Sequence, residues 1–249
     1  MNKHAKQLTI AIIILALLSG SWLFFNHSSF ANHPSSTNFK IGVVHETKNY
    51  TQRQQFAFNY HLAKKFKFAK HQTIIVTGTA QALKKQFRHH QLQLLLGVSS
   101  QQTTTSKINY LFLPNVLVVN QKHVTKDLTK YHHQLGLAHT ALPSSLSDLH
   151  LKQKKYANEK KLLTAIDQSQ IHAGIMSSLE YNYLTKKQPE LLSTTETQAA
   201  FPPLTASVSG AMVDQKYRTT INNKFKKMQL NGQLAELSVK YFLQDYTQE

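Results

Sequence analysis

Short apolar segments alternate with amphipathic segments along the chain, and no other feature limits its possible folds as strongly. The first apolar run, Phe39–Val44, precedes residues 52–68, in which aromatic residues and alanine recur at helical spacing. Thr73–Thr77, the helical pattern of residues 80–90 and the run Leu92–Leu96 continue the alternation. This strand, helix, strand, helix, strand order predicts an α/β fold with a parallel sheet.

The pattern changes after residue 115 and then begins again. Strands are predicted at Val116–Val119, Gln134–Ala138, Ile171–Ile175 and Thr205–Val213, and helices at Glu159–Asp167 and after Ser177. Ser177 stands where a helix-capping residue is expected. Two more helices are predicted near the end, separated by Asn231 and Gly232, a natural helix stop. A second α/β unit is therefore expected.

The N-terminus has the pattern of an export signal. Lys3 and Lys6 precede the uncharged apolar run Leu8–Phe25, and a polar stretch follows. Ser29-Phe30-Ala31 has the small-residue spacing that a signal peptidase reads, so cleavage after Ala31 is one reading and an uncleaved membrane anchor is the other. Residues 1–31 are thus a signal peptide or anchor and residues 32–37 a linker. Either reading makes the rest extracytoplasmic, held at the cell surface or secreted.

The chain is strongly basic, with 29 Lys and Arg against 12 Asp and Glu. Such a charge would favour nucleic acid inside a cell, but an exported protein meets anionic lipid head groups and envelope polymers instead. We therefore expect no nucleic-acid partner, and either anionic envelope polymers or a simply solvated basic surface. Because the sequence has no cysteine, disulfides, thiol catalysis and thiolate metal sites are excluded.

An uncharged polar run follows the third predicted strand. Gly97 is followed, after Val98, by eight consecutive hydroxyl or amide side chains, residues 99–106. Parallel α/β sheets bind ligands beyond the carboxyl ends of their strands, and a glycine there lets the backbone approach a ligand closely. Gly97 and Ser99 are therefore candidate ligand-binding residues, with an ordinary polar loop as the alternative.

The order of segments resembles the extracellular solute-binding proteins of polar amino-acid ABC importers, over roughly residues 38–248. The opening strand Phe39–Val44 is similar to that family's first strand. The resemblance continues in AFNYHLAKKF, residues 57–66; in ALKKQFRHHQLQLLLGVSS, residues 82–100; in Leu162–Leu191, which ends in Gln-Pro-Glu-Leu; and in the closing helix pair Tyr217–Phe242. The stretch Leu162–Leu191 is the most specific match.

The resemblance implies a periplasmic-binding-protein-like fold of type 2, with two α/β lobes closing on a ligand. The first lobe would comprise residues 38–115 plus 210–249, and the second lobe residues 116–209. The implied function is that of a solute-binding protein, expected as a monomer, which presents a small polar solute to an ABC permease in the membrane. The alternative is a cell-surface interaction protein that reuses the fold to bind anionic envelope polymers.

The positions at which that family holds a charged ligand have changed here. Thr104 stands where an arginine clasps the ligand carboxylate, and Ser177 where an aspartate takes the ammonium. Thr79 stands where an aromatic ring stacks on the ligand, while Asn59 and His61 replace acidic residues of its signature. Since a charge-assisted hydrogen bond contributes about 1.5–3 kcal/mol, losing both anchors favours a neutral or altered ligand.

Three further residues are candidates for ligand contact. Glu46 and Tyr50 follow the first predicted strand, and Ser144 is placed to cap a helix in the segment His139–Ser145. Plain surface positions or helix capping would explain the same residues.

The sequence offers little for catalysis or metal binding. His89-His90 and His132-His133 are adjacent pairs, whose side chains point in different directions, and metal-binding spacings are missing. There is no nucleophile motif, no phosphate loop and no closely spaced pair of acids. We expect no cofactor, no metal and no enzymatic activity.

Overall fold

The computed structural model describes residues 38–68, 71–99, 107–123, 128, 135–139, 142–200 and 204–248. Residues Asn38–Glu249 form one compact unit. The signal or anchor segment predicted at residues 1–31 and the linker at 32–37 lie outside the described residues. Within the described part of the chain, no helix is long and apolar enough to cross a membrane.

The described residues form two five-stranded sheets. The first has the order β2-β1-β3-β10-β4. Its strands are β1 (Asn38–Val44), β2 (Gln72–Gly78), β3 (Leu94–Ser99), β4 (Lys107–Leu113) and β10 (Ser207–Val213). β1 pairs in parallel with β2 and β3, as predicted, whereas β10 is antiparallel to both β3 and β4. The sheet is therefore mixed.

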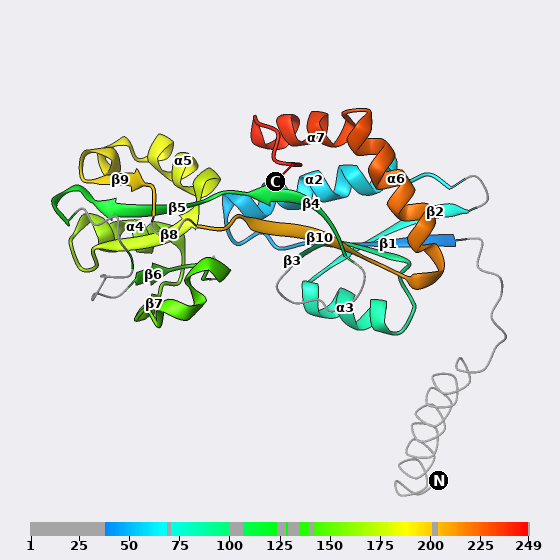
Figure 1. Ribbon diagram of the computed structural model, residues 1–249, viewed down its shortest axis with the longest axis horizontal. Coiled ribbons are helices and arrows are strands. Elements are labelled where there is room, and N and C mark those ends of the chain that lie inside the picture. The colour runs from blue at the N-terminus through cyan, green and yellow to red at the C-terminus, as the bar shows by residue number, and fades with distance from the viewer. Residues whose placement is uncertain are drawn as a thin grey trace, which may run out of the picture. The chain divides into compact units, whose positions relative to one another are not determined.

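Helices cover both faces of the first sheet (Figure 1). The helices α2 (Tyr50–Lys65), α6 (Arg218–Leu230) and α7 (Gln233–Phe242) pack on one face, and α3 (Ala80–Arg88) packs on the other. The larger core lies under α2, where Phe58, Leu62 and Tyr110 are at most 1% exposed. Burial of such side chains stabilises by roughly 1.5–3 kcal/mol each and fixes α2 on the sheet.

The second sheet has the order β7-β6-β8-β5-β9. Its strands are β5 (Asn115–Asn120), β6 (Leu135–Leu137), β7 (Gln153–Lys155), β8 (Ala173–Ser177) and β9 (Thr195–Gln198). The helices α4 (Glu159–Asp167) and α5 (Ser178–Lys187) belong to this lobe, and the apolar side of α4 packs on the sheet. Short 3-10 helices lie at Gln121–His123, Ser144–Leu149, Pro189–Ser193 and Gln215–Tyr217.

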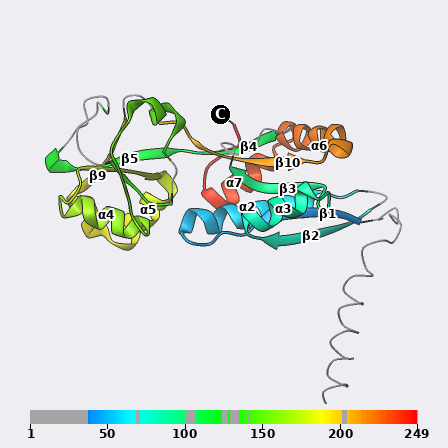
Figure 2. The ribbon, with the colours of Figure 1, turned by 90° about the horizontal axis from the view of Figure 1, so that it is seen from below.

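Two segments cross between the lobes (Figures 1 and 2). β4 continues through Pro114 into β5, and the chain returns to enter β10. The Asn115 side chain ties the two segments together, since it donates a 2.8 Å hydrogen bond to the Thr205 carbonyl and accepts one of 3.1 Å from the Ser207 hydroxyl. We call Pro114, Asn115 and residues 205–207 the hinge. The residue boundaries predicted for the lobes stay a prediction.

The predicted elements recur in the structure with small shifts in their bounds. The helix expected over residues 52–68 is α2, which begins at Tyr50 because Asn49 caps it, with the Asn49 side chain accepting from the Gln52 N–H. The expected break at Asn231 and Gly232 separates α6 from α7, and Gly232 has a φ of 75°. β7, β9 and β4 were not predicted: β7 and β9 are short, whereas the run Ile108–Leu113 of β4 is rich in strand-favouring residues.

Candidate functional site

A cleft of about 690 Å³ lies between the two lobes, next to the hinge. The loop after β1, the start of α3 and the end of β3 form one wall, while β10 and α2 lie beside them. The residues that line it with hydroxyl, amide or charged side chains are Glu46, Asn49, Thr51, Gln52, Gln55, Lys84, Ser99, Asn109, Asn115, His139, Ser177, Thr205, Ser207 and Ser209. The cleft thus offers mostly uncharged hydrogen-bonding groups.

The end of β3 is shaped by Gly97. Its φ of 82° belongs to the left-handed region, and a Cβ at this position would lie 2.7 Å from the Asn59 side-chain nitrogen. The Tyr110 hydroxyl accepts a 2.8 Å hydrogen bond from the Gly97 N–H and donates one of 2.8 Å to Asn59. Burial raises the pKa of Tyr110 well above its usual value, so this hydroxyl stays protonated. Tyr110 and Asn59 therefore fix the backbone at Gly97, two residues before Ser99.

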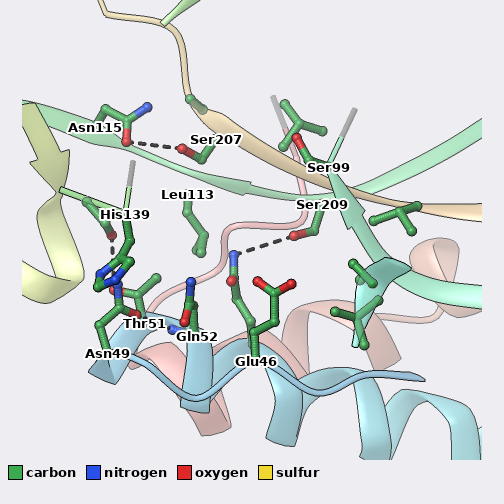
Figure 3. A pocket seen from close by; sticks show the side chains of 18 of the residues that line it. Glu46, Asn49, Thr51, Gln52, Ser99, Leu113, Asn115, His139, Ser207 and Ser209 are labelled. Atoms are coloured by element: carbon green, nitrogen blue, oxygen red, sulfur yellow. Dashed lines mark hydrogen bonds between the residues drawn. The ribbon is translucent and has the colours of Figure 1, made fainter. Parts of the chain in front are cut away.

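Two serines of β10 form a second wall. Ser207 and Ser209 are two residues apart on a strand, so they point to the same side of the sheet. Gln55 donates a 3.4 Å hydrogen bond to the Ser209 hydroxyl, and Ser207 binds Asn115 of the hinge. Figure 3 shows Glu46 and Ser209 pointing into the same space from opposite sides.

The second lobe contributes Ser177 and His139. Ser177 ends β8 and caps α5, because its hydroxyl accepts from the Leu179 N–H at 3.3 Å. His139 Nδ1 lies 3.0 Å from Glu159 Oε2, at the buried start of α4. Behind Ser177, burial raises the pKa of Glu180, and the charge of Glu159 raises it further.

The structure brings several of the predicted site residues together. Gly97, Ser99, Ser177 and Glu46 all line the cleft. Whether they contact a solute stays a prediction.

Tyr50 and Thr79 are not among the residues that line the cleft. The Tyr50 ring stacks on that of Tyr183, with centroids 4.3 Å apart, and is not part of the cleft lining. Thr79 caps α3 by accepting from the Ala82 N–H. The cap predicted at Ser144 is corrected: the 3-10 helix begins at Ser144 itself, and Pro143 holds the cap position without a side-chain bond. Thr104 lies outside the described residues.

Several lining residues were not predicted from the sequence. Gln52 and Gln55 belong to the polar face of α2, which looks like any solvated helix face in the sequence. The alternation of Ser207 and Ser209 along a predicted strand was a usable signal, because residues two apart share a face. Among the described residues, no group of three or more His, Cys, Asp or Glu side chains is arranged to hold a metal ion.

No protein-family model matches the chain, and no curated protein matches its sequence. Solved structures do match. One, reported for glutathione import in Gram-positive bacteria via GshT and the cystine ABC importer TcyBC of Streptococcus mutans, has a TM-score of 0.59 and 14% identity, covering 86% of this chain and 98% of its own.

Two further solved structures match at a similar level. The GluR0 ligand-binding core in complex with L-glutamate has a TM-score of 0.58 and 12% identity, covering 84% of this chain and 99% of its own. YckB of Bacillus subtilis has a TM-score of 0.58 and 12% identity, covering 85% and 93%.

The two sheets, the paired crossing segments and these likenesses define the fold. The chain has the two-lobed, type 2 periplasmic-binding-protein-like fold that its sequence resemblance predicts. At such low identities the likeness extends to the fold and not to the ligand.

Proposed function

We propose that the chain is an exported solute-binding protein that takes a small, uncharged polar solute in the cleft between its lobes and presents it to an ABC permease. The fold supports this, since structures described for glutathione import and for L-glutamate binding share it. A cleft of about 690 Å³ is within the usual range of small-molecule sites, about 300–1,000 Å³.

The proposal about the solute rests on the residues that line the cleft. Among the described lining residues, hydroxyls and amides predominate, and the fully charged ones are Glu46 and Lys84. A solute carboxylate or ammonium would have to leave water, which costs several kcal/mol per ion unless a partner charge compensates. Hydroxyl and amide groups of a solute lose less on leaving water and match Ser207, Ser209, Gln52 and Gln55.

A thermal-shift series on the purified protein tests this function. The panel contains sugars, polyols, glutamine, acidic and basic amino acids, and short peptides including glutathione. We expect an uncharged polar solute to raise Tm by several degrees at saturating concentration, because a ligand at 100 times its Kd stabilises by about 2.7 kcal/mol. The acidic amino acids should have little effect.

Matched variants assign the effect to the cleft. Ser209→Ala removes a lining hydroxyl, whereas Thr219→Ala removes an exposed hydroxyl on α6. The solute should stabilise T219A as it does the wild type and S209A at least fivefold more weakly in apparent Kd. A panel without any stabilising solute, or an equal response from both variants, would contradict the proposal.

A further inference from the structure

The start of α2, in the first lobe, lies against two glutamates of the second lobe. The Thr51 N–H donates a 2.9 Å hydrogen bond to Glu180 Oε2 on α5. The Asn49 side-chain NH₂ donates one of 2.6 Å to Glu159 Oε1 on α4. In each pair the two residues are more than a hundred positions apart in the chain, and the hydrogen bond connects the first lobe to the second.

Three of the four residues in these contacts are buried, and Asn49 is half-buried. Glu159 is 2% exposed, Glu180 4% and Thr51 7%. A helix N-terminus has unpaired N–H groups and a partial positive charge, which a carboxylate stabilises. The first turn of α2 contains no acidic residue of its own, and a carboxyl oxygen of Glu180, from the other lobe, accepts from one of these N–H groups.

Neighbouring contacts extend the junction. The Tyr50 and Tyr183 rings stack face to face at 4.3 Å. The Thr51 hydroxyl lies 3.4 Å from the Ser177 hydroxyl. Leu179, the second residue of α5, is 9% exposed and packs in the hydrophobic core of the first lobe. Polar and apolar contacts therefore connect the two lobes at the start of α2.

We propose that these residues form a cross-lobe latch, with Asn49, Tyr50 and Thr51 on the first lobe and Glu159, Glu180 and Tyr183 on the second. The latch holds the lobes together through the chain's own side chains, so the closed form is populated before any solute contributes. This goes beyond the proposed function, because the latch joins the lobes whatever the cleft binds. Since Glu180 already accepts from the start of α2, a solute carboxylate cannot use that donor without opening the latch.

A cross-link tests the latch directly. The sequence has no cysteine, so Thr51→Cys and Ser177→Cys introduce the chain's only two thiols. The two hydroxyl oxygens they replace are 3.4 Å apart, and the Thr51→Cys change keeps the N–H that binds Glu180. We expect the full-length double variant, without added solute, to form the disulfide completely under mild oxidation by oxidised glutathione, measured by mass spectrometry as loss of both alkylatable thiols without bound glutathione.

A charge substitution at the latch supplies the decisive comparison. Asn49→Asp keeps a side chain that can cap α2, but it replaces the NH₂ facing Glu159 with a carboxylate. Asn158→Asp makes the same change at the cap of α4, where the asparagine side chain binds the Lys161 N–H. In the two-cysteine background we expect N49D to slow cross-linking at least fivefold and N158D to leave the rate unchanged.

Circular dichroism and thermal melts establish that each variant is folded. If N49D does not fold, Tyr183→Ala replaces it in the same background, with the same expected slowing. Thiols that stay alkylatable in the folded protein would overturn the latch, and so would equal cross-linking rates in all variants. Neither measurement uses a solute, so a failed latch is distinguishable from a failed solute-binding function.

Discussion

The hydroxyl of Tyr110 on β4 accepts a 2.8 Å hydrogen bond from the N–H of Gly97 on β3. The two strands are not neighbours in the sheet, since β10 lies between them. Tyr110 is 1% exposed, and its hydroxyl also donates to buried Asn59. The cleft wall at Gly97 is thus supported by a buried polar network that reaches α2.

Replacing Tyr110 with phenylalanine tests this network. The change leaves the Gly97 N–H and the Asn59 carbonyl without that partner, and we expect a loss of about 1–3 kcal/mol in the free energy of unfolding, measured by urea denaturation. Tyr246→Phe is the control, because the Tyr246 hydroxyl makes an exposed bond to Gln244. Its effect should stay within about 0.5 kcal/mol. Equal losses in the two variants would show that the buried network contributes no more to stability than the exposed bond of Tyr246.

Alanine at Gly97 should destabilise the first lobe through both strain and contact. The φ of 82° is unfavourable for alanine by about 1–2 kcal/mol, and the new Cβ would lie 2.7 Å from Asn59. Gly232→Ala isolates the first effect, since Gly232 has a φ of 75° and nothing within 4 Å of its added Cβ. Urea denaturation should show G97A to be the less stable variant by about 1 kcal/mol or more. A reversed order would contradict the close contact with Asn59.

The raised pKa of Glu180 predicts a dependence of stability on pH. Burial is the main cause, and the charge of Glu159, itself next to His139, adds to it. A carboxyl whose pKa is higher in the folded protein binds its proton more readily there. Its contribution to stability is therefore present below its ordinary pKa of about 4.5 and is lost as the pH rises through the folded value.

Glu180→Gln removes this titration. The difference in Tm, E180Q minus wild type, should increase as the pH is raised from about 4.5 to 7, as measured by differential scanning calorimetry. Glu236→Gln, at an exposed position in the first turn of α7, should not show this increase. A Tm difference that stays constant, or decreases, over this range would show that Glu180 does not titrate as its burial implies.

Asn115→Ala should loosen the hinge. It removes the bonds to the Thr205 carbonyl and the Ser207 hydroxyl, each contributing about 0.5–1.5 kcal/mol. We expect faster hydrogen exchange at residues 205–209 while the cores of both lobes remain protected. Asn222→Ala, an exposed change on α6, should leave the exchange pattern as it is. Unchanged exchange in N115A would argue against a role of this side chain in the hinge.

The sequence contains enough local information to place most helices and the parallel strands. Ser177 as the cap of α5 and the break at Gly232 are confirmed, because both depend on backbone preferences of neighbouring residues. The direction of β10 could not be predicted, since alternation along a strand is the same whichever way its neighbour runs. β4 was missed although Ile108, Tyr110 and Phe112 alternate along it, which is a usable strand signal.

The cleft was predictable only in part. Gly97 and Ser99 follow from the rule that loops at strand ends bind ligands, and both line the cleft. The stacking of Tyr50 on Tyr183 and the bond from Thr51 to Glu180 join residues from distant parts of the chain. Such pairs have no signature in a single sequence, because each partner alone looks like an ordinary helix residue.

The place of β10 between β3 and β4 has a consequence for biogenesis. The strands of the second sheet come from one continuous stretch, Asn115 to Gln198, whereas the first sheet needs a strand that emerges only afterwards, Ser207–Val213. A chain that emerges N-terminus first can complete the second sheet early. β3 and β4 expose unpaired edges until synthesis is nearly finished, because β10 is made last. Completion of the first sheet is thus the late step of folding. A chain whose translation stops just before Ser207 would keep these strand edges exposed and would be prone to aggregate.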